Sequence, residues 1–167
     1  MPQNASSATE AALRTRLATE ADLARLIPLI NSAFSVETFF DGTRTDEERL
    51  KANLQKGEIL VAENASGQLL ACIYLENRGA RGYLGQLAVD PAMQRAGLGR
   101  GIVLAAENRL RSQGCEAVEI TVLNLRSELP PIYRRFGYIE TATEPFHSPR
   151  PLKPGAECHC IVMTKRL

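Results

Sequence analysis

Apolar residues near the start of the chain recur every three or four positions, which is the period of an amphipathic helix. Thr19 and Asp22 form a capping-box pattern in front of them. Pro28 interrupts the pattern, so we expect a kink or break there. A second helix is expected to start at Thr45, where acidic residues suit the helix dipole, and to end at Gly57. The apolar positions of the first helix are Leu23, Leu26, Ile27, Ile30 and Phe34.

Other segments alternate with a period of two or carry short β-branched runs, as strands do. Turn sequences at 64–67 and 77–82 predict antiparallel hairpins between neighbouring strands. A further strand is expected to start within 138–141. The expected strands are 14–17, 58–63, 69–76, 83–89, 117–123 and 158–165.

A third helix is expected over 99–113, between two of these strands. A strand–helix–strand unit of this kind predicts a right-handed parallel crossover. A short helix over 130–136 starts with prolines and ends at Gly137. Residues 141–157 hold four of the nine prolines and are expected to be irregular, which in a compact domain usually means a functional or disordered loop.

Composition adds limits to this picture. The 167 residues carry a formal net charge of +1, with 44% hydrophobic and 23% charged residues, as in an ordinary globular domain. Residues 13–167 are expected to form one domain, and residues 1–12 a disordered leader without the features of a signal peptide. The charge balance argues against bulk binding to nucleic acid or to a membrane surface. Four cysteines without metal spacing suggest a reducing, cytoplasmic location.

The stretch from Leu87 to Gly101 is the most informative one. A strand leads into a loop with Gly97 and Gly99 and then into a helix. Such a loop directs backbone N–H groups and the positive helix end at one point, which suits a phosphate. The ATP-binding loop is excluded because no Gly-Lys-Ser/Thr follows, and the dinucleotide fingerprint fits badly because Gly101 comes one position early. A glycine-rich connection without a ligand remains the alternative.

Several motifs now coincide. Gln94-Arg-Ala-Gly-Leu-Gly99 follows Leu87-Ala-Val-Asp-Pro, Asn124 ends the next strand, and Tyr133-Arg-Arg-Phe-Gly-Tyr138 follows that. In these motifs and their order the chain resembles the GNAT superfamily of N-acetyltransferases from about residue 13 onward. The resemblance implies an α/β fold of the α+β type. It has a mixed, mainly antiparallel sheet of six to seven strands, splayed at the strands ending at Val89 and Leu123, with helices on both faces.

The resemblance also implies acetyl-CoA as the cosubstrate. The glycine loop would wrap the pyrophosphate, the strand backbone would pair with the pantetheine arm, and an N–H, expected to be that of Leu87, would hold the thioester carbonyl. The implied cofactor residues are Leu87, Ala88, Val89, Gln94, Arg95, Ala96, Gly97, Leu98, Gly99, Arg100, Asn124 and Tyr133. Asn124 would bond either to the cofactor arm or to backbone across the splayed strands, the alternative being a turn residue at the strand end.

By the same resemblance Tyr133 would act as the general acid that protonates the leaving sulfur, the alternative being a half-buried core tyrosine. The general base is open. Many relatives carry Glu where this chain has Gln86, which can position water or the amine but cannot take a proton. Glu76 is a candidate by analogy or else a solvated strand end. Asp90 reads as a turn residue and His147 as an exposed loop residue.

The acceptor pocket is expected between segments 34–44 and 141–157. Phe39 and Phe40 would form an apolar wall, or else anchor a surface loop. Glu37 or Asp41 would hold an ammonium. The charge distribution supports separate sites for cofactor and acceptor. Residues 94–111 carry four arginines and Glu107, a local +3 that suits the phosphates of CoA, whereas residues 37–48 carry five acids and Arg44, a local −4 that suits a cationic amine.

The leading hypothesis is therefore an N-acetyltransferase that acts on a small amine or on a peptide or protein amino group, as a monomer or homodimer. A non-catalytic acyl-CoA-binding or sensing module and a phosphate-binding scaffold unrelated to CoA are the alternatives. No metal is expected, because alternation along Cys158-His159-Cys160 points His159 away from the two sulfurs.

Overall fold

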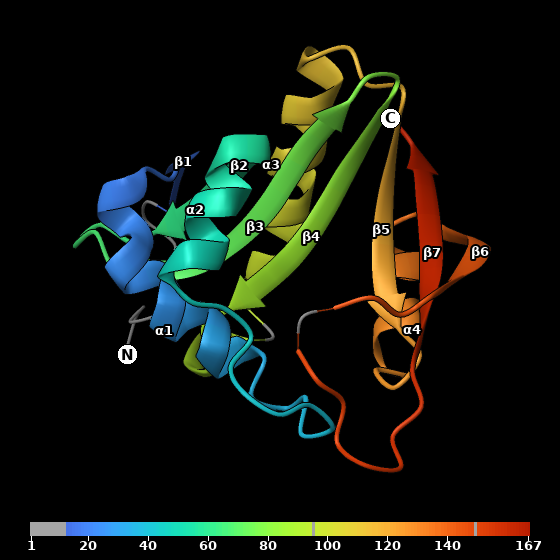
Figure 1. Ribbon diagram of the computed structural model, residues 1–167. Helices are drawn as coiled ribbons and strands as arrows, with labels where there is room; N and C mark the ends of the chain where they lie inside the picture. Colours follow the sequence, from blue (N-terminus) through green and yellow to red (C-terminus); the bar gives the residue numbers. More distant parts are fainter. Residues whose placement is uncertain (1–12, 95, 149) are drawn as a thin grey trace, which may run out of the picture.

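The computed structural model describes residues 13–94, 96–148 and 150–167, so the expected leader lies outside the described residues (Figure 1). Most elements fall where the sequence pattern predicts them. In chain order they are β1 (Arg14–Leu17), a 3-10 turn (Glu20–Asp22), α1 (Leu23–Ala33), α2 (Glu47–Lys56), β2 (Glu58–Glu63), β3 (Leu69–Arg78), β4 (Arg81–Val89), a second 3-10 turn (Pro91–Met93), α3 (Leu98–Ser112), β5 (Ala117–Leu123), α4 (Leu129–Arg135), β6 (Ile139–Pro145) and β7 (His159–Arg166).

The seven strands form one sheet in the order β1-β2-β3-β4-β5-β7-β6. Only β4 and β5 pair in parallel, and all the other neighbours are antiparallel. The parallel pair is joined through α3, as the strand–helix–strand pattern predicts. The mixed, mainly antiparallel sheet with helices on both faces is therefore confirmed.

Helices cover both faces of the sheet, α1 and α2 on one face and α3 and α4 on the other (Figure 1). One core lies under α1 and α2, where Leu26, Ile30 and Leu50 pack against alternate residues of β2 and β3. The other core lies under α3, where Ile102, Ala106 and Leu110 pack against the β2 and β3 residues that point to the opposite face of the sheet. Alternation along β3 thus serves both cores, with Ile73 on the α3 face and Tyr74 on the α1 face.

One buried carboxylate ties α3 to the C-terminal part of the sheet. Glu107 is 2% exposed. It accepts a hydrogen bond of 2.8 Å from the Tyr138 hydroxyl and one of 2.9 Å from Lys165 Nζ. A buried carboxylate needs such partners because its desolvation is otherwise costly. This contact fixes α3 over β5 and β7, and so fixes the position of its N-terminus.

Three expectations about local structure need correction. The expected kink or break at Pro28 is corrected as to the break: α1 is continuous through Pro28, since a proline φ suits the helix and only the bond to the Ala24 carbonyl is lost. Helix α2 is capped by Asp46 rather than Thr45, and the Asp46 side chain accepts from the Arg49 N–H. Residues 141–145 are not irregular, because β7 supplies ladder partners to β6 that local sequence does not reveal.

The feature that positions the site is a divergence of β4 from β5. The two strands pair only from Arg81–Ala117 to Leu84–Ile120 and then separate, as Figure 1 shows. On its other edge β4 carries one residue more than β3 between the pairs Tyr74–Gly85 and Cys72–Ala88. This bulge contains Gln86, whose φ of 51° is unusual for a residue other than glycine. The predicted splay at these strands is confirmed.

Candidate active site

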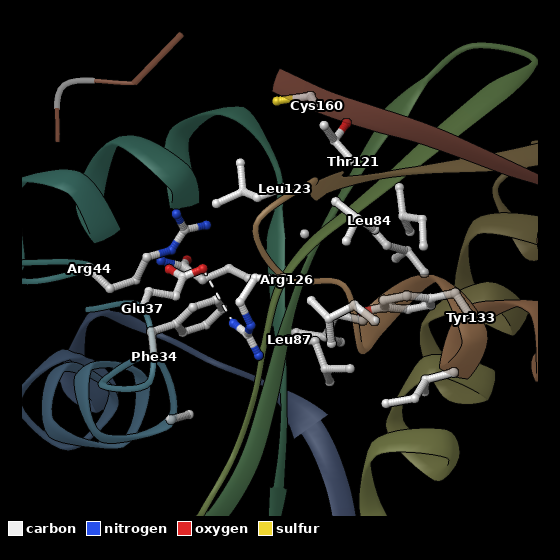
Figure 2. A pocket seen from close by; sticks show the side chains of 18 of the residues that line it. Phe34, Glu37, Arg44, Leu84, Leu87, Thr121, Leu123, Arg126, Tyr133 and Cys160 are labelled. Atoms are coloured by element: carbon white, nitrogen blue, oxygen red, sulfur yellow. Dashed lines mark hydrogen bonds and ion pairs between the residues drawn. The ribbon is translucent and has the colours of Figure 1, made fainter. Parts of the chain in front are cut away.

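A cavity of about 600 Å³ lies between the separated ends of β4 and β5 (Figure 2). Its lining comes from both strands, from α3 and α4, from the connection between α1 and α2, and from the residues after β6. Because residues from both faces of the sheet contribute, the cavity passes through the sheet rather than lying on it. One end is mostly apolar and the other is strongly charged.

The bulge determines which β4 side chains face the apolar end. Without the extra residue, Leu84, Gln86 and Ala88 would share a face. Instead Leu87 and Val89 turn to the α3 side, where they line the cavity. Ala88 turns to the core under α1 and does not line it. Among the described residues, the β4 edge that faces β5 has no strand partner beyond Leu84. Apart from the Val89 carbonyl, which accepts from the Gln94 side chain, its N–H and C=O groups are therefore open to an extended, amide-containing ligand.

Tyr133 extends from α4 toward Leu87 across the apolar end (Figure 2). Its ring packs edge-on against Phe136 and Tyr138, which fixes its direction. Burial raises the pKa of Tyr133 to about 12, an effect partly opposed by Arg126. No hydrogen bond joins its hydroxyl to another described residue. A protonated hydroxyl without a protein partner is able to donate to a ligand in the cavity.

The glycine loop leads from β4 to the start of α3. Gly97 is the N-cap residue and has a φ of 79°, a left-handed conformation that glycine adopts at little cost. The Gln94 side chain donates to the Val89 carbonyl over 3.3 Å and lines the cavity. Ala96 is exposed and Leu98 is buried. The cavity reaches this loop at Gln94, and the first N–H groups of α3, which have no partner within the helix, follow a few residues later.

The basic residues predicted beside this loop contribute unequally. Arg100 is exposed, and its guanidinium lies 6.0 Å from the centre of the Phe136 ring. It does not line the cavity, although it remains at the surface near the start of α3. Arg95 lies outside the described residues. Gly99 leaves the space next to Val89 almost open, since an added Cβ would lie 3.7 Å from that side chain.

The opposite end of the cavity is built around Glu37, which is 5% exposed. Its two carboxylate oxygens accept from Arg126 over 3.3 Å and from Arg150 over 3.2 Å. Arg44 lies beside them, stacked at 4.7 Å on the Phe34 ring. Burial lowers the pKa of Arg44, as do Arg150 and Arg126, against a rise caused by Glu37. This end of the cavity therefore carries more positive than negative charge.

A second tyrosine, Tyr83, lines the cavity in addition to Tyr133. Burial raises the pKa of its phenol, whereas Arg44 and Arg78 lower it. Its hydroxyl bonds to no other described residue. Gly85 makes room for this ring, because a Cβ there would lie 2.9 Å from the hydroxyl oxygen. Tyr83 and Tyr133 thus offer two free hydroxyls to the same cavity.

Comparison with known proteins identifies this architecture. A sequence model described as "Acetyltransferase (GNAT) domain" matches residues 19–148. The chain belongs to the GNAT acetyltransferase family. The ribosomal-protein-S18-alanine N-acetyltransferase from Escherichia coli is 17% identical, with a TM-score of 0.74 over 93% of this chain and 94% of that one. Comparison with curated protein sequences gives no match.

Two further solved structures share the GNAT fold. The ribosomal-protein-alanine N-acetyltransferase from Brucella melitensis is 22% identical, with a TM-score of 0.73 and coverage of 93% of this chain and 100% of that one. A putative acetyltransferase from Salmonella typhimurium, solved with its cofactor acetyl-CoA, is 20% identical, with a TM-score of 0.72 and coverage of 93% and 94%. Acetyl-CoA use by a protein of this fold is thereby supported.

Several site residues expected in this GNAT domain lie elsewhere. Glu76 does not line the cavity, since its carboxylate accepts from the Tyr74 hydroxyl over 2.6 Å and from Arg78 over 2.8 Å. Arg78 lowers the pKa of Glu76, which makes it a weaker base. Asn124 accepts from the His159 N–H over 2.8 Å and so extends the β5–β7 pairing instead of facing the cavity.

Of the residues expected to bind the acceptor, some line the cavity and others do not. Gln86 lines the cavity, with its Oε1 accepting from Asn53 over 3.1 Å. Phe39 and Phe40 stand behind the wall, where Phe40 packs 5.3 Å from Phe146, a lining residue. The expectation that Glu37 holds an ammonium has to be revised, because two guanidiniums already occupy its carboxylate.

Other expected residues have simpler positions. Asp41 is exposed and does not line the cavity. Asp90 accepts from the Ala92 N–H and is a turn residue, as expected. His147 is exposed, but it does line the cavity.

Sequence reasoning missed Tyr83, Arg126 and Arg150. Their only sequence signal is position: Tyr83 stands three residues before the bulge, and the two arginines lie in the loops after β5 and β6. Across the described residues no group of three His, Cys, Asp or Glu side chains is arranged to hold a metal. None of the described helices has the length and apolar character to cross a membrane.

Proposed function

We propose that this GNAT protein transfers an acetyl group from acetyl-CoA to a primary amine by direct attack on the thioester. One observation carries the proposal. A single cavity is lined by Gln94 of the glycine loop, by Leu87 and Val89 on the unpaired edge of β4, and by Tyr133 with its free hydroxyl. These are the parts needed to bind a phosphate, to pair with an amide chain and to protonate a leaving group.

The residues present fit acetyl-CoA. The N–H groups around Gly97 would take its pyrophosphate, and the β4 edge at Leu87 and Val89 would pair with the amides of its pantetheine arm. Apolar side chains such as Val103, Val122 and Leu129 line the same end of the cavity and suit the methylene groups. When bound, acetyl-CoA supplies the acetyl group as an activated thioester.

The chain's own residues would then manage charge and protons. The N–H of Leu87, in the bulge, would hold the negative charge that develops on the carbonyl oxygen. The Tyr133 hydroxyl would donate its proton to the departing sulfur. Its raised pKa keeps the phenol protonated until then, so the proton is available at neutral pH.

Removal of the amine proton is assigned to His147. The two carboxylates that line the cavity are both bound to arginine: Glu37 to Arg126 and Arg150, and Glu128 to Arg126 over 2.6 Å. His147 lines the cavity and is exposed, so a proton taken up there can pass to solvent. The unprotonated nitrogen of a neutral imidazole is a proton acceptor.

The deciding experiment measures CoA thiol release with a panel of primary amines, for the wild type and for Tyr133→Phe. Turnover that falls in the variant, with acetyl-CoA affinity unchanged, is the expected result. Tight acetyl-CoA binding with no turnover on any amine would instead establish the alternative, a non-catalytic acyl-CoA-binding module. Calorimetry that finds no binding of CoA or dephospho-CoA would overturn both readings.

A further inference from the structure

Three guanidiniums and one buried carboxylate lie together at the charged end of the cavity: Arg44, Arg126 and Glu37 line it, whereas Arg150 is buried and does not. Glu37 is bonded to Arg126 and Arg150, and Arg44 lies next to this group (Figure 2). These four groups sum to +2, and Glu128, half-exposed at the rim and bonded to Arg126, reduces the sum to +1. A simple ammonium would meet net repulsion here, whereas an anion would be attracted.

Arg44 is the member of this group that lacks a partner. In the described part of the chain it makes no hydrogen bond or ion pair, and its Nε atom is fully buried without a partner. The stack on Phe34 holds its side chain at the cavity wall. A buried guanidinium left unpaired is costly, since its N–H groups have given up water without replacement. A ligand oxyanion would offset that cost.

The CoA phosphates are not the natural partner of Arg44. They are expected at the start of α3, on the face of the sheet where Val103 and Tyr133 lie. Arg44 stands beyond Tyr83, on the face covered by α1 and α2. An anion that binds Arg44 would therefore belong to the acceptor rather than to CoA.

We propose that the acceptor is a small molecule that carries an oxyanion, such as a carboxylate or phosphonate, close to its amine, and that Arg44 binds this oxyanion. This inference rests on the proposed acetyl transfer and names the substrate class of the same site. Arginine suits the role because its planar fork matches a two-oxygen anion. Arg126 and Arg150, held by Glu37, supply the surrounding positive potential.

The walls around Arg44 favour a small acceptor over a protein tail. The segment after α1 and the segment after β6 are bonded to each other through the Phe40–Leu152 bridge. The Asp41 N–H donates to the Pro151 carbonyl and the Lys153 N–H to that of Phe39, both over 3.0 Å. Figure 1 shows these two loops meeting at the open end of the sheet. These bonds join the two loops into one wall beside the charged end of the cavity.

The test compares substrates that differ only in the anion. Leucine, methionine and glutamate are each assayed beside their carboxamides, their decarboxylated amines and their 1-aminophosphonate analogues, with short peptides as a further set. We expect the carboxylates or phosphonates to exceed the uncharged forms in kcat/KM by at least about tenfold. The carboxylate and phosphonate arms identify which oxyanion the site prefers.

Variants tie the preference to Arg44. Arg44→Gln is expected to abolish it by raising KM for the anionic amines at least about tenfold, with KM for acetyl-CoA unchanged. Arg44→Lys should restore part of the preference, since charge remains without the fork. Arg166→Gln, an exposed arginine beside the start of β5 at the far end of the sheet, is the matched control. Thermal melts confirm that Arg44→Gln folds, which removal of an unpaired buried charge favours.

A binding measurement separates this inference from the proposed function. Calorimetry with the CoA-loaded protein follows binding of the amino acids without turnover. Binding that Arg44→Gln abolishes, without acetylation of any amine, would uphold the anion site and overturn the acetyl transfer. Turnover that favours the uncharged amines or the peptides, or anion binding unaffected by Arg44→Gln, would overturn the anion site and leave acetyl transfer standing.

Discussion

The ring of Tyr83 lies so close to Gly85 that a Cβ at Gly85 would be 2.9 Å from the Tyr83 hydroxyl oxygen. Gly85→Ala is therefore expected to push the ring out of place while the fold survives, since the obstacle is the end of a side chain. We expect KM for the acceptor to rise about three- to tenfold, for a loss of about 1 kcal/mol of binding. Steady-state kinetics measures this.

Gly82→Ala is the control for that variant. A Cβ at Gly82 would lie 2.6 Å from the Leu110 side chain in the buried core. It should lower stability by about 1–3 kcal/mol, because overpacking a core forces shifts, without a specific effect on acceptor KM. Equal changes in acceptor KM for the two variants would show that Tyr83 has no part in acceptor binding.

Tyr133→Phe should reduce kcat by about 100-fold if the hydroxyl protonates the leaving sulfur. Because the pKa of Tyr133 is raised to about 12, the wild-type rate should not fall with rising pH up to about pH 10. Tyr74→Phe, which also deletes a buried hydroxyl but outside the cavity, serves as control and should keep kcat. A full kcat in Tyr133→Phe would remove the assigned acid.

His147→Gln should lower kcat/KM for the acceptor near neutral pH by about tenfold or more, since the variant cannot accept a proton. The deficit should shrink toward about pH 9–10, where more of the amine is already deprotonated. A pH–rate profile of both proteins gives the answer. A constant deficit at every pH would assign His147 to packing rather than to proton transfer.

Gly97→Ala should weaken CoA binding by about tenfold, because a methyl group would enter the space where the phosphate approaches the start of α3. No described protein atom lies within 4 Å of that methyl. Gly114, at the other end of α3, has a φ of 94° and is equally free of neighbours. Gly114→Ala should thus show the same backbone strain of about 1 kcal/mol with CoA affinity intact. Calorimetry and thermal melts compare the two.

Asp22 should make the fold sensitive to acid. It is 3% exposed and accepts from Arg16, Arg25 and the Thr19 N–H, and Arg16 above all holds its pKa well below the ordinary value. The folded pKa is lower than the unfolded one, so the stabilisation is complete above about pH 5 and is lost progressively as the pH falls.

Asp22→Asn tests this directly. We expect it to cost about 3 kcal/mol near neutral pH, because two arginines lose a buried partner, and to flatten the acid side of the stability curve. Denaturant unfolding at several pH values measures both effects. Glu20→Gln, an exposed residue of the same turn, is the control and should change stability little. An unaltered acid transition in Asp22→Asn would contradict the assignment.

The sequence by itself determined most of the helices and strands of this protein and the position of its glycine loop. The strands at 58–63 and 117–123 and the glycine-rich loop before α3 follow from periodicity and residue type within a few positions. Such signals are local, so they can be read from the chain without knowing what packs against it. Tyr133 was likewise found from a short motif in the right order of elements.

Only the tertiary structure decided which β4 side chains point to which side of the sheet, and what net charge surrounds Glu37 at the charged end of the cavity. The bulge at Gln86 moves Leu87 and Val89 to the other side of the sheet, and no residue type in that strand announces it. The Glu37 carboxylate reads as a local negative charge, yet its partners are 89 and 113 residues away, at Arg126 and Arg150. Charge in a pocket is summed in space, because Coulomb energies depend on distance and burial rather than on separation along the chain.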